Sequence, residues 1–183
     1  MLEFIIEDNK ISKCITDEEI VTIPENIIVL KAYSFKDNSF IKKVICSKSV
    51  NIIDVEAFCN CINLEEVVIK EGTTIISEHV FDGCINLKKI YLPKTIKKLG
   101  ELFLNNNKGK VEIIYEGSSK KLFELIKDRY VCVSHQTQND FHYYGDSVDK
   151  FVPDIWEESK IISDNVDFVA QCLEDNVILN SKK

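Results

Sequence analysis

The chain has 183 residues, with 23 basic and 30 acidic side chains and a formal net charge of −7. Acidic residues outnumber basic ones on both sides of Gly117, so the sequence argues against direct binding to nucleic acid or to an anionic membrane surface. No apolar run approaches the ~18 residues of a membrane span, and the opening residues lack the basic region of a signal peptide. We therefore expect one modest domain with a tail, in the cytoplasm.

A 23-residue repeat dominates the chain from Val21 to Leu99. Three phenylalanines and two further apolar columns recur at this spacing: Phe35, Phe58 and Phe81; Leu30, Ile53, Ile76 and Leu99; and Val21, Val44, Val67 and Ile90. A fixed period of this length is typical of stacked units, and it predicts a solenoid whose rungs contact only their neighbours. Within a rung, alternation points Val67 and Ile69 inward and Val68 outward on a short strand.

The seven cysteines favour reduced thiols over a disulfide framework, because their number is odd and no export signal is visible. Cys46, Cys61 and Cys84 occupy repeat positions that suit small core residues. Cys59 and Cys61 are predicted to point to opposite sides of the rung. With no second Cys or His pair at zinc spacing, no metal site is expected.

Two segments carry a family resemblance. The stretch from Ala57 through Leu64 to Ile76, and the stretch Val80-Phe81-Asp82-Gly83-Cys84-Ile85-Asn86-Leu87 to Ile90-Tyr91-Leu92-Pro93, are similar to the BspA-type leucine-rich repeat, with its A-F-x-x-C-x-x-L-x-x-I-x-L-P pattern. The resemblance covers roughly residues 1 to 145. It implies an α/β repeat solenoid that begins with a hairpin over Phe4–Ile11, with Asp8-Asn9 as the turn. Family members are most often surface or secreted proteins.

The last rung and the C-terminal cap follow. Leu99 and Phe103 are closer in sequence than Ile76 and Phe81, and three asparagines replace the small-residue turn, so we expect this rung to be irregular. The resemblance implies a strand-helix-strand cap from Ile113 to Tyr144. Ser118 or Ser119 suits the start of its helix, whose core-covering residues are Leu122, Phe123 and Ile126. The expected division is 1–117 solenoid, 118–146 cap and 147–183 tail.

The tail is predicted to be helical. Pro153 suits the start of a helix through Trp156, and Ser163-Asp164 suits the cap of a second helix that carries Val166, Val169, Leu173 and Val177. This amphipathic tail must pack on its own solenoid, on a second copy or on another protein, with Trp156 and Phe168 as candidate anchors. The chain is thus expected to be a monomer or a tail-mediated homodimer.

Charges alternate along two repeat columns. One column is Glu19, Lys42, Glu65 and Lys88; the other is Glu25, Lys48, Glu71 and Lys94. Rungs about 4.8 Å apart would place each Lys beside a Glu of the next rung, which favours the correct register. Each exposed pair contributes only about 0.2–1 kcal/mol.

Two outward columns are apolar. Thr22, Ile45, Val68 and Tyr91 form one, while Val29, Ile52 and Ile75 form another that ends at Lys98. Such stripes have three readings: the preference of β-branched residues for strands, cover by the protein's own tail, or a protein-binding face. We take Ile45, Val68, Tyr91, Val29, Ile52 and Ile75 as candidate binding residues, together with the tail anchors.

Catalysis has little support in the sequence. His79 stands in a rung turn, and a thiol–imidazole pair among Cys132, His135 and His142 lacks an accompanying oxyanion hole, phosphate loop or carboxylate pair. We therefore predict a non-catalytic module that binds a protein partner and needs no cofactor. The alternative is a small acidic intracellular inhibitor or regulator that blocks an enzyme or nucleic-acid-binding complex.

Overall fold

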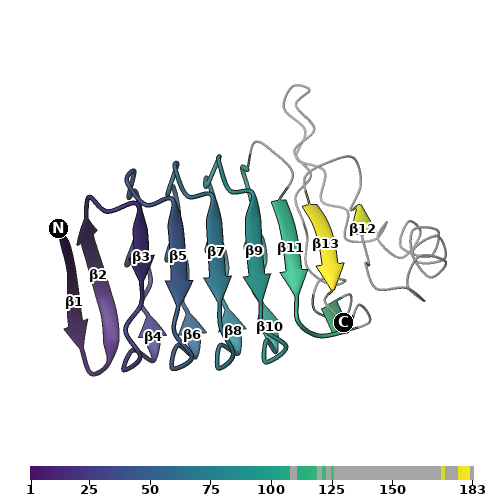
Figure 1. The fold of residues 1–183 in the computed structure, drawn as a ribbon, viewed down its shortest axis with the longest axis horizontal. Coiled ribbons are helices and arrows are strands. Elements are labelled where there is room, and N and C mark those ends of the chain that lie inside the picture. Colours follow the sequence, from purple (N-terminus) through teal and green to yellow (C-terminus); the bar gives the residue numbers. More distant parts are fainter. Residues whose placement is uncertain (108–110, 119–120, 123–124, 126–169, 172–176, 182–183) are drawn as a thin grey trace.

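The computed structural model describes residues 1–107, 111–118, 121–122, 125, 170–171 and 177–181. These residues form a β-solenoid of about four turns built from two sheets (Figure 1). Sheet 1 has the strand order β12 (Ala170–Gln171), β13 (Val177–Ser181), β11 (Val111–Tyr115), β9 (Lys89–Leu92), β7 (Glu66–Ile69), β5 (Lys43–Cys46) and β3 (Ile20–Thr22). Sheet 2 has the order β1 (Leu2–Glu7), β2 (Lys10–Thr16), β4 (Val29–Leu30), β6 (Ile52–Ile53), β8 (Ile75–Ile76) and β10 (Lys98–Leu99).

The strand registers confirm the 23-residue repeat. In sheet 1, Val44 of β5 lies beside Val21 and Val67, and Val67 lies beside Ile90. In sheet 2, the parallel strands β4, β6, β8 and β10 keep the same step. The inward residues of strands β3 to β11 are buried, as the alternation predicted.

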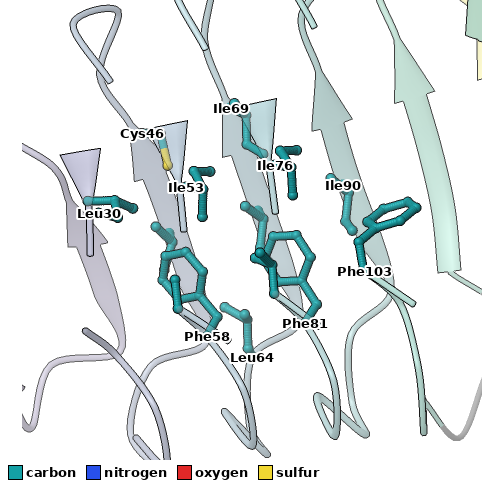
Figure 2. Close-up of a cluster of buried hydrophobic side chains, with 14 of the residues drawn as sticks. Leu30, Cys46, Ile53, Phe58, Leu64, Ile69, Ile76, Phe81, Ile90 and Phe103 are labelled. Atoms are coloured by element: carbon teal, nitrogen blue, oxygen red, sulfur yellow. The ribbon is translucent and has the colours of Figure 1, made fainter. Parts of the chain in front are cut away.

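The core lies between the two sheets, where the repeat phenylalanines stack. The ring centroids of Phe35 and Phe58 are 4.6 Å apart and those of Phe58 and Phe81 are 5.6 Å apart, with the rings nearly parallel in the second pair. Figure 2 shows Phe58 and Phe81 among the aliphatic residues of neighbouring strands. Offset stacking of this kind adds to the free energy gained from burial alone.

The last described rung keeps the backbone register of the others. Phe103 O accepts a hydrogen bond from Phe81 N, just as Val80 O accepts one from Phe58 N. Phe103 therefore stands at the Val80 position, and buried Leu104 takes the position of the phenylalanine column. The predicted irregularity is confirmed in the turn itself, because the turn bonds from Asp82 N to His79 O and from Cys84 N to Phe81 O have no counterpart at Asn105 and Asn107 among the described residues, although the chain keeps its 23-residue step.

A column of donors runs beside the phenylalanines. The Cys61 thiol donates to Phe35 O and the Cys84 thiol donates to Phe58 O, both at 3.1 Å. At the same position in the last rung, Asn107 Nδ2 donates to Phe81 O at 3.5 Å and to Cys84 O at 2.7 Å. A longer amide thus replaces the buried thiol where the repeats end, and it adds a second donor to two carbonyls that already accept from the backbone N–H groups of Cys84 and Leu87.

Each rung also contains two turn residues in the left-handed region. Tyr33, Glu56, His79 and Leu102 share one repeat position with φ between 49° and 64°, and Asp37, Asn60, Gly83 and Asn106 share the other with φ between 55° and 70°. The second position suits Asn, Asp and Gly, which tolerate this conformation best. The first position holds residues that gain nothing locally from a positive φ, so the stacked neighbours impose that conformation.

The N-terminal hairpin is confirmed. Strands β1 and β2 pair antiparallel, and Asp8 and Asn9 form the turn with positive φ. Leu2 and Phe4 pack against the core, with the Phe4 ring 6.4 Å from that of Phe35 in an edge-on arrangement. The hairpin therefore covers the first rung, which would otherwise expose its apolar interior.

The start of the C-terminal cap is described only in part. Ser118 Oγ accepts a hydrogen bond from Lys121 N at 3.3 Å, and Ser118 O accepts one from Leu122 N at 3.0 Å. Leu122 and Leu125 are buried with helical backbone, but the structure describes no complete helix here. Phe123, Ile126 and the predicted strand around Phe141–Tyr144 lie outside the described residues.

The predicted second helix of the tail is wrong in its described part. Ala170–Gln171 and Val177–Ser181 are the strands β12 and β13, and β13 pairs in parallel with β11 from Val111↔Val177 to Tyr115↔Ser181. Strand β11 would otherwise present an unpaired edge, and the run Val177-Ile178-Leu179 has the composition of a strand. The helical spacing of Val166, Val169, Leu173 and Val177 therefore predicted a helix at Val177, where the structure has a strand.

The buried thiols predict a loss of stability at alkaline pH. Burial raises the pKa of Cys46 to about 12, so the folded state keeps a proton that the unfolded chain loses above pH ~8.5. The stability that this thiol contributes is present below the unfolded pKa and is lost as the pH rises toward the folded pKa. Between pH 9 and 11, the free energy of unfolding should fall by about 1.4 kcal/mol per pH unit for this one group.

Urea unfolding of the wild type and of Cys46→Val over that pH range measures this slope, which the variant should reduce by the stated amount. Ile69→Val is the matched control, because Ile69 stands at the same buried repeat position without a titrating group. It should shift the curve without changing its slope. Parallel curves for the wild type and Cys46→Val would contradict the prediction.

Candidate functional site

The outward face of sheet 1 carries two parallel rows of side chains. One row, which we call the apolar stripe, follows the register Thr22↔Ile45↔Val68↔Tyr91↔Ile114. The other, which we call the charge row, follows Lys43↔Glu66↔Lys89↔Glu112. Figure 1 shows the strands of this sheet side by side and nearly parallel, so each row crosses the face from rung to rung.

The apolar stripe becomes less exposed toward the C-terminal rungs. Thr22 is exposed, Ile45, Val68 and Tyr91 are half-buried, and Ile114 is 8% exposed. The predicted alignment of Ile45, Val68 and Tyr91 on one face is confirmed. Half-buried residues aligned over several rungs make a continuous apolar surface, which isolated exposed side chains do not.

The charge row is a feature that the sequence reasoning missed. The Lys43 ammonium lies 2.8 Å from the Glu66 carboxylate and the Lys89 ammonium lies 3.0 Å from that of Glu112. The hydrogen bond to Glu112 raises the pKa of Lys89, which keeps the ammonium charged. The same 23-residue alternation of sign was visible in the sequence, one residue after the column that begins at Glu19.

That neighbouring column pairs as predicted. Lys42 lies 2.6 Å from Glu19, and Lys88 lies 2.7 Å from Glu65. The hydrogen bond from Lys88 lowers the pKa of Glu65, and the bond to Glu19 raises that of Lys42. In the other predicted column, Lys94 lies 3.2 Å from Glu71. Lys and Glu thus alternate from rung to rung in these columns.

The second candidate stripe lies on sheet 2. Val29, Ile52 and Ile75 stand in register on β4, β6 and β8 and are half-buried. Exposed lysines stand at both ends of this row, Lys10 on β2 and Lys98 on β10. The two candidate stripes therefore lie on different sheets and do not form one site.

The rung turns hold a cluster of polar side chains that includes a thiol and a histidine. The Lys36 ammonium lies 2.7 Å from the Glu56 carboxylate, and His79 Nδ1 lies 3.5 Å from Asp82 Oδ2. Cys59 lies beside this cluster and outside the core that contains Cys61, and burial raises its pKa to about 11. The thiol is therefore protonated at neutral pH and a poor nucleophile. Among the described residues, no three His, Cys, Asp or Glu side chains gather as metal ligands.

Several candidate residues of the sequence lie outside the described part. These are Trp156 and Phe168, which were candidate anchors, and Cys132, His135 and His142. Within the described part, no helix is long and apolar enough to cross a membrane.

The repeats decide the family. The model of the BspA type leucine rich repeat region matches residues 5–122 with 6 copies. The chain belongs to the BspA-type leucine-rich repeat family. The resemblance seen in the repeat segments is thereby confirmed, and the architecture suggests a protein-interaction module, as in leucine-rich repeat proteins generally. No curated protein matches the sequence significantly.

Several solved structures share the fold. The T. pallidum leucine-rich repeat protein TpLRR is 18% identical with a TM-score of 0.54, covering 66% of this chain and 63% of that one. The pneumococcal vaccine antigen PcpA is 26% identical with a TM-score of 0.56, covering 61% and 28%. A leucine-rich repeat protein from Bacteroides capillosus is 21% identical with a TM-score of 0.53, covering 63% and 93%. The chain thus spans less than two thirds of TpLRR and of PcpA.

Proposed function

We propose that this BspA-type repeat protein is a non-catalytic protein-binding module and that its binding surface is the outward face of sheet 1. The observation that carries the proposal is the register of Ile45, Val68 and Tyr91, which aligns half-buried apolar side chains across neighbouring rungs. Tyr is favoured at the centres of interfaces, and the flanking lysines and glutamates supply a polar rim.

The charges of this face do not favour the acidic inhibitor. In the rows described above, these glutamates form ion pairs with lysines of an adjacent rung, so the face alternates in sign. A competitor for a basic site would instead need a surface of one sign.

The double substitution Val68→Lys with Tyr91→Lys tests the binding face. Lysine at both positions would place two charges against the apolar surface of a partner, and loss of a central anchor typically costs 2 kcal/mol or more, which is about 30-fold in affinity. The tagged chain is used as bait in a lysate of its own cells, and the retained proteins are quantified by mass spectrometry. At least one protein held by the wild type should be lost from the variant.

The matched control is Ile52→Lys with Ile75→Lys, which places the same charges on the half-buried stripe of sheet 2. This control should retain the partner. Urea unfolding of both variants separates binding from folding: if Val68→Lys with Tyr91→Lys keeps its stability and its full set of partners, the proposed binding face is wrong. A large loss of stability in that variant would show instead that the stripe is internal packing.

A further inference from the structure

When the order of the charge row is reversed, every lysine position coincides with a glutamate position. In chain order the signs are plus, minus, plus and minus, at Lys43, Glu66, Lys89 and Glu112. The reversed row begins with Glu112, so each lysine faces a glutamate. The side chains are also accessible, with exposed fractions of 34%, 32%, 37% and 30% in the same order.

A twofold axis achieves this reversal. An axis parallel to the strands, lying above sheet 1 between β7 and β9, inverts the order of the rungs but preserves the position along each strand. It therefore places charge row on charge row and apolar stripe on apolar stripe. Lys43 faces Glu112 of the second copy and Glu66 faces Lys89 of the second copy, while Val68 faces Tyr91 of that copy.

We propose that the partner of this face is a second copy of the chain, bound face to face through sheet 1 with its rungs in the reverse order and its strands parallel. The inference rests on the proposed function, since it identifies the protein that the face binds. Its contacts are isologous, as in most soluble homodimers, and the arrangement closes with two subunits.

The neighbouring column fits the same axis. Glu65 directly precedes β7 and Lys88 directly precedes β9, so the same axis brings the starts of these two strands, with their opposite charges, toward each other in the two copies. Moving the axis by one rung, to lie between β5 and β7, would place Lys89 opposite Ile20, which the register aligns with Lys43. The axis between β7 and β9 is therefore the one that pairs every charge of the row.

The size of the face sets the expected strength of the dimer. Strands about 4.8 Å apart give a charge row about 14 Å long over its four strands, so the face is small beside the ~1,200–2,000 Å² buried in stable interfaces. The dimer should therefore form in the micromolar range and dissociate on dilution. Its ion pairs lie at a solvent-exposed rim, so added salt should weaken it.

Charge-swap variants separate contacts between copies from those within one copy. Lys43→Glu with Glu66→Lys keeps the ion pair within the chain but brings like charges together across the axis. Lys43→Glu with Glu112→Lys does the reverse: it breaks both pairs within the chain and keeps opposite charges across the axis. Reversing all four charges restores both kinds of contact.

Sedimentation equilibrium of the full chain over about 1–500 µM measures the dissociation constant. We expect a monomer–dimer equilibrium for the wild type, at least a ten-fold weaker dimer for Lys43→Glu with Glu66→Lys, and a dissociation constant within about three-fold of the wild type for Lys43→Glu with Glu112→Lys. Urea unfolding should show the opposite order of effects on the monomer, because only the second variant loses pairs within the chain.

Three outcomes would overturn the dimer. These are a wild type that stays monomeric at the highest concentration, a dimer that survives Lys43→Glu with Glu66→Lys, and a dimer that only the second variant weakens. The proposed function fails separately, when the lysate experiment finds no partner that depends on Val68 and Tyr91. A monomeric wild type that retains a foreign protein, together with a Val68→Lys and Tyr91→Lys variant that loses it, would leave the function standing and the dimer overturned.

Discussion

Replacing Phe58 with Ala should lower the free energy of unfolding by about 3–5 kcal/mol, the usual cost of truncating a buried phenylalanine. Phe58 is fully buried and its ring lies between those of Phe35 and Phe81. The loss would be close to the whole stability of a marginal domain. Because each rung contacts only its neighbours, the cavity would weaken both interfaces of the central rung.

Urea unfolding followed by far-ultraviolet circular dichroism measures the change. Ile62→Ala is the matched control, since Ile62 lies in the turn of the same rung and is 42% exposed. That variant should lose less than about 1 kcal/mol. Similar losses for the two variants would contradict the assignment of the phenylalanine column to the core.

Replacing Gly72 with Ala should lower the free energy of unfolding by at least about 2 kcal/mol. Gly72 has a φ of +118°, a backbone conformation that residues with a Cβ atom rarely adopt. Holding such a residue in that conformation costs of order 1–3 kcal/mol. A Cβ atom there would also lie 1.9 Å from the backbone oxygen of Lys48 in the preceding rung. The backbone of one rung must therefore move away from the other.

Gly83 offers the contrast, because its φ of +70° lies in the left-handed region that Asn60 and Asn106 adopt at the same repeat position. A Cβ atom at Gly83 would meet mainly the Asn60 side-chain oxygen, which can move aside. Gly83→Asn should therefore cost less than about 1 kcal/mol in the same urea experiment. If Gly72→Ala proved as mild as Gly83→Asn, close contact between the rung backbones at Gly72 would be refuted.

Much of the solenoid was predictable because its information is periodic. The spacing of Phe35, Phe58 and Phe81 specified the register of the rungs, and the alternation around Val67 specified which residues face inward. The turn at Asp8-Asn9 marked the N-terminal hairpin. Each of these signals is local or repeats many times, so one sequence sufficed to read it.

The candidate site was predictable in part. The register that aligns the core also aligns Ile45, Val68 and Tyr91, so the apolar stripe followed from the repeat. The charge row was not predicted, although Lys43 and Glu66 show the same period. Its pairing distances and its exposure required coordinates.

The sequence by itself thus determined the repeat length, the inward and outward sets and the N-terminal cap of this protein. Only the tertiary structure decided that Val177–Ser181 adds a strand beside β11, that Leu104 takes the place expected for Phe103, and that Asn107 continues the cysteine column. The physical reason is the same in each case. A strand edge, a core position or a carbonyl within reach of a donor is supplied by the neighbouring rung, and residues close in sequence carry no record of it.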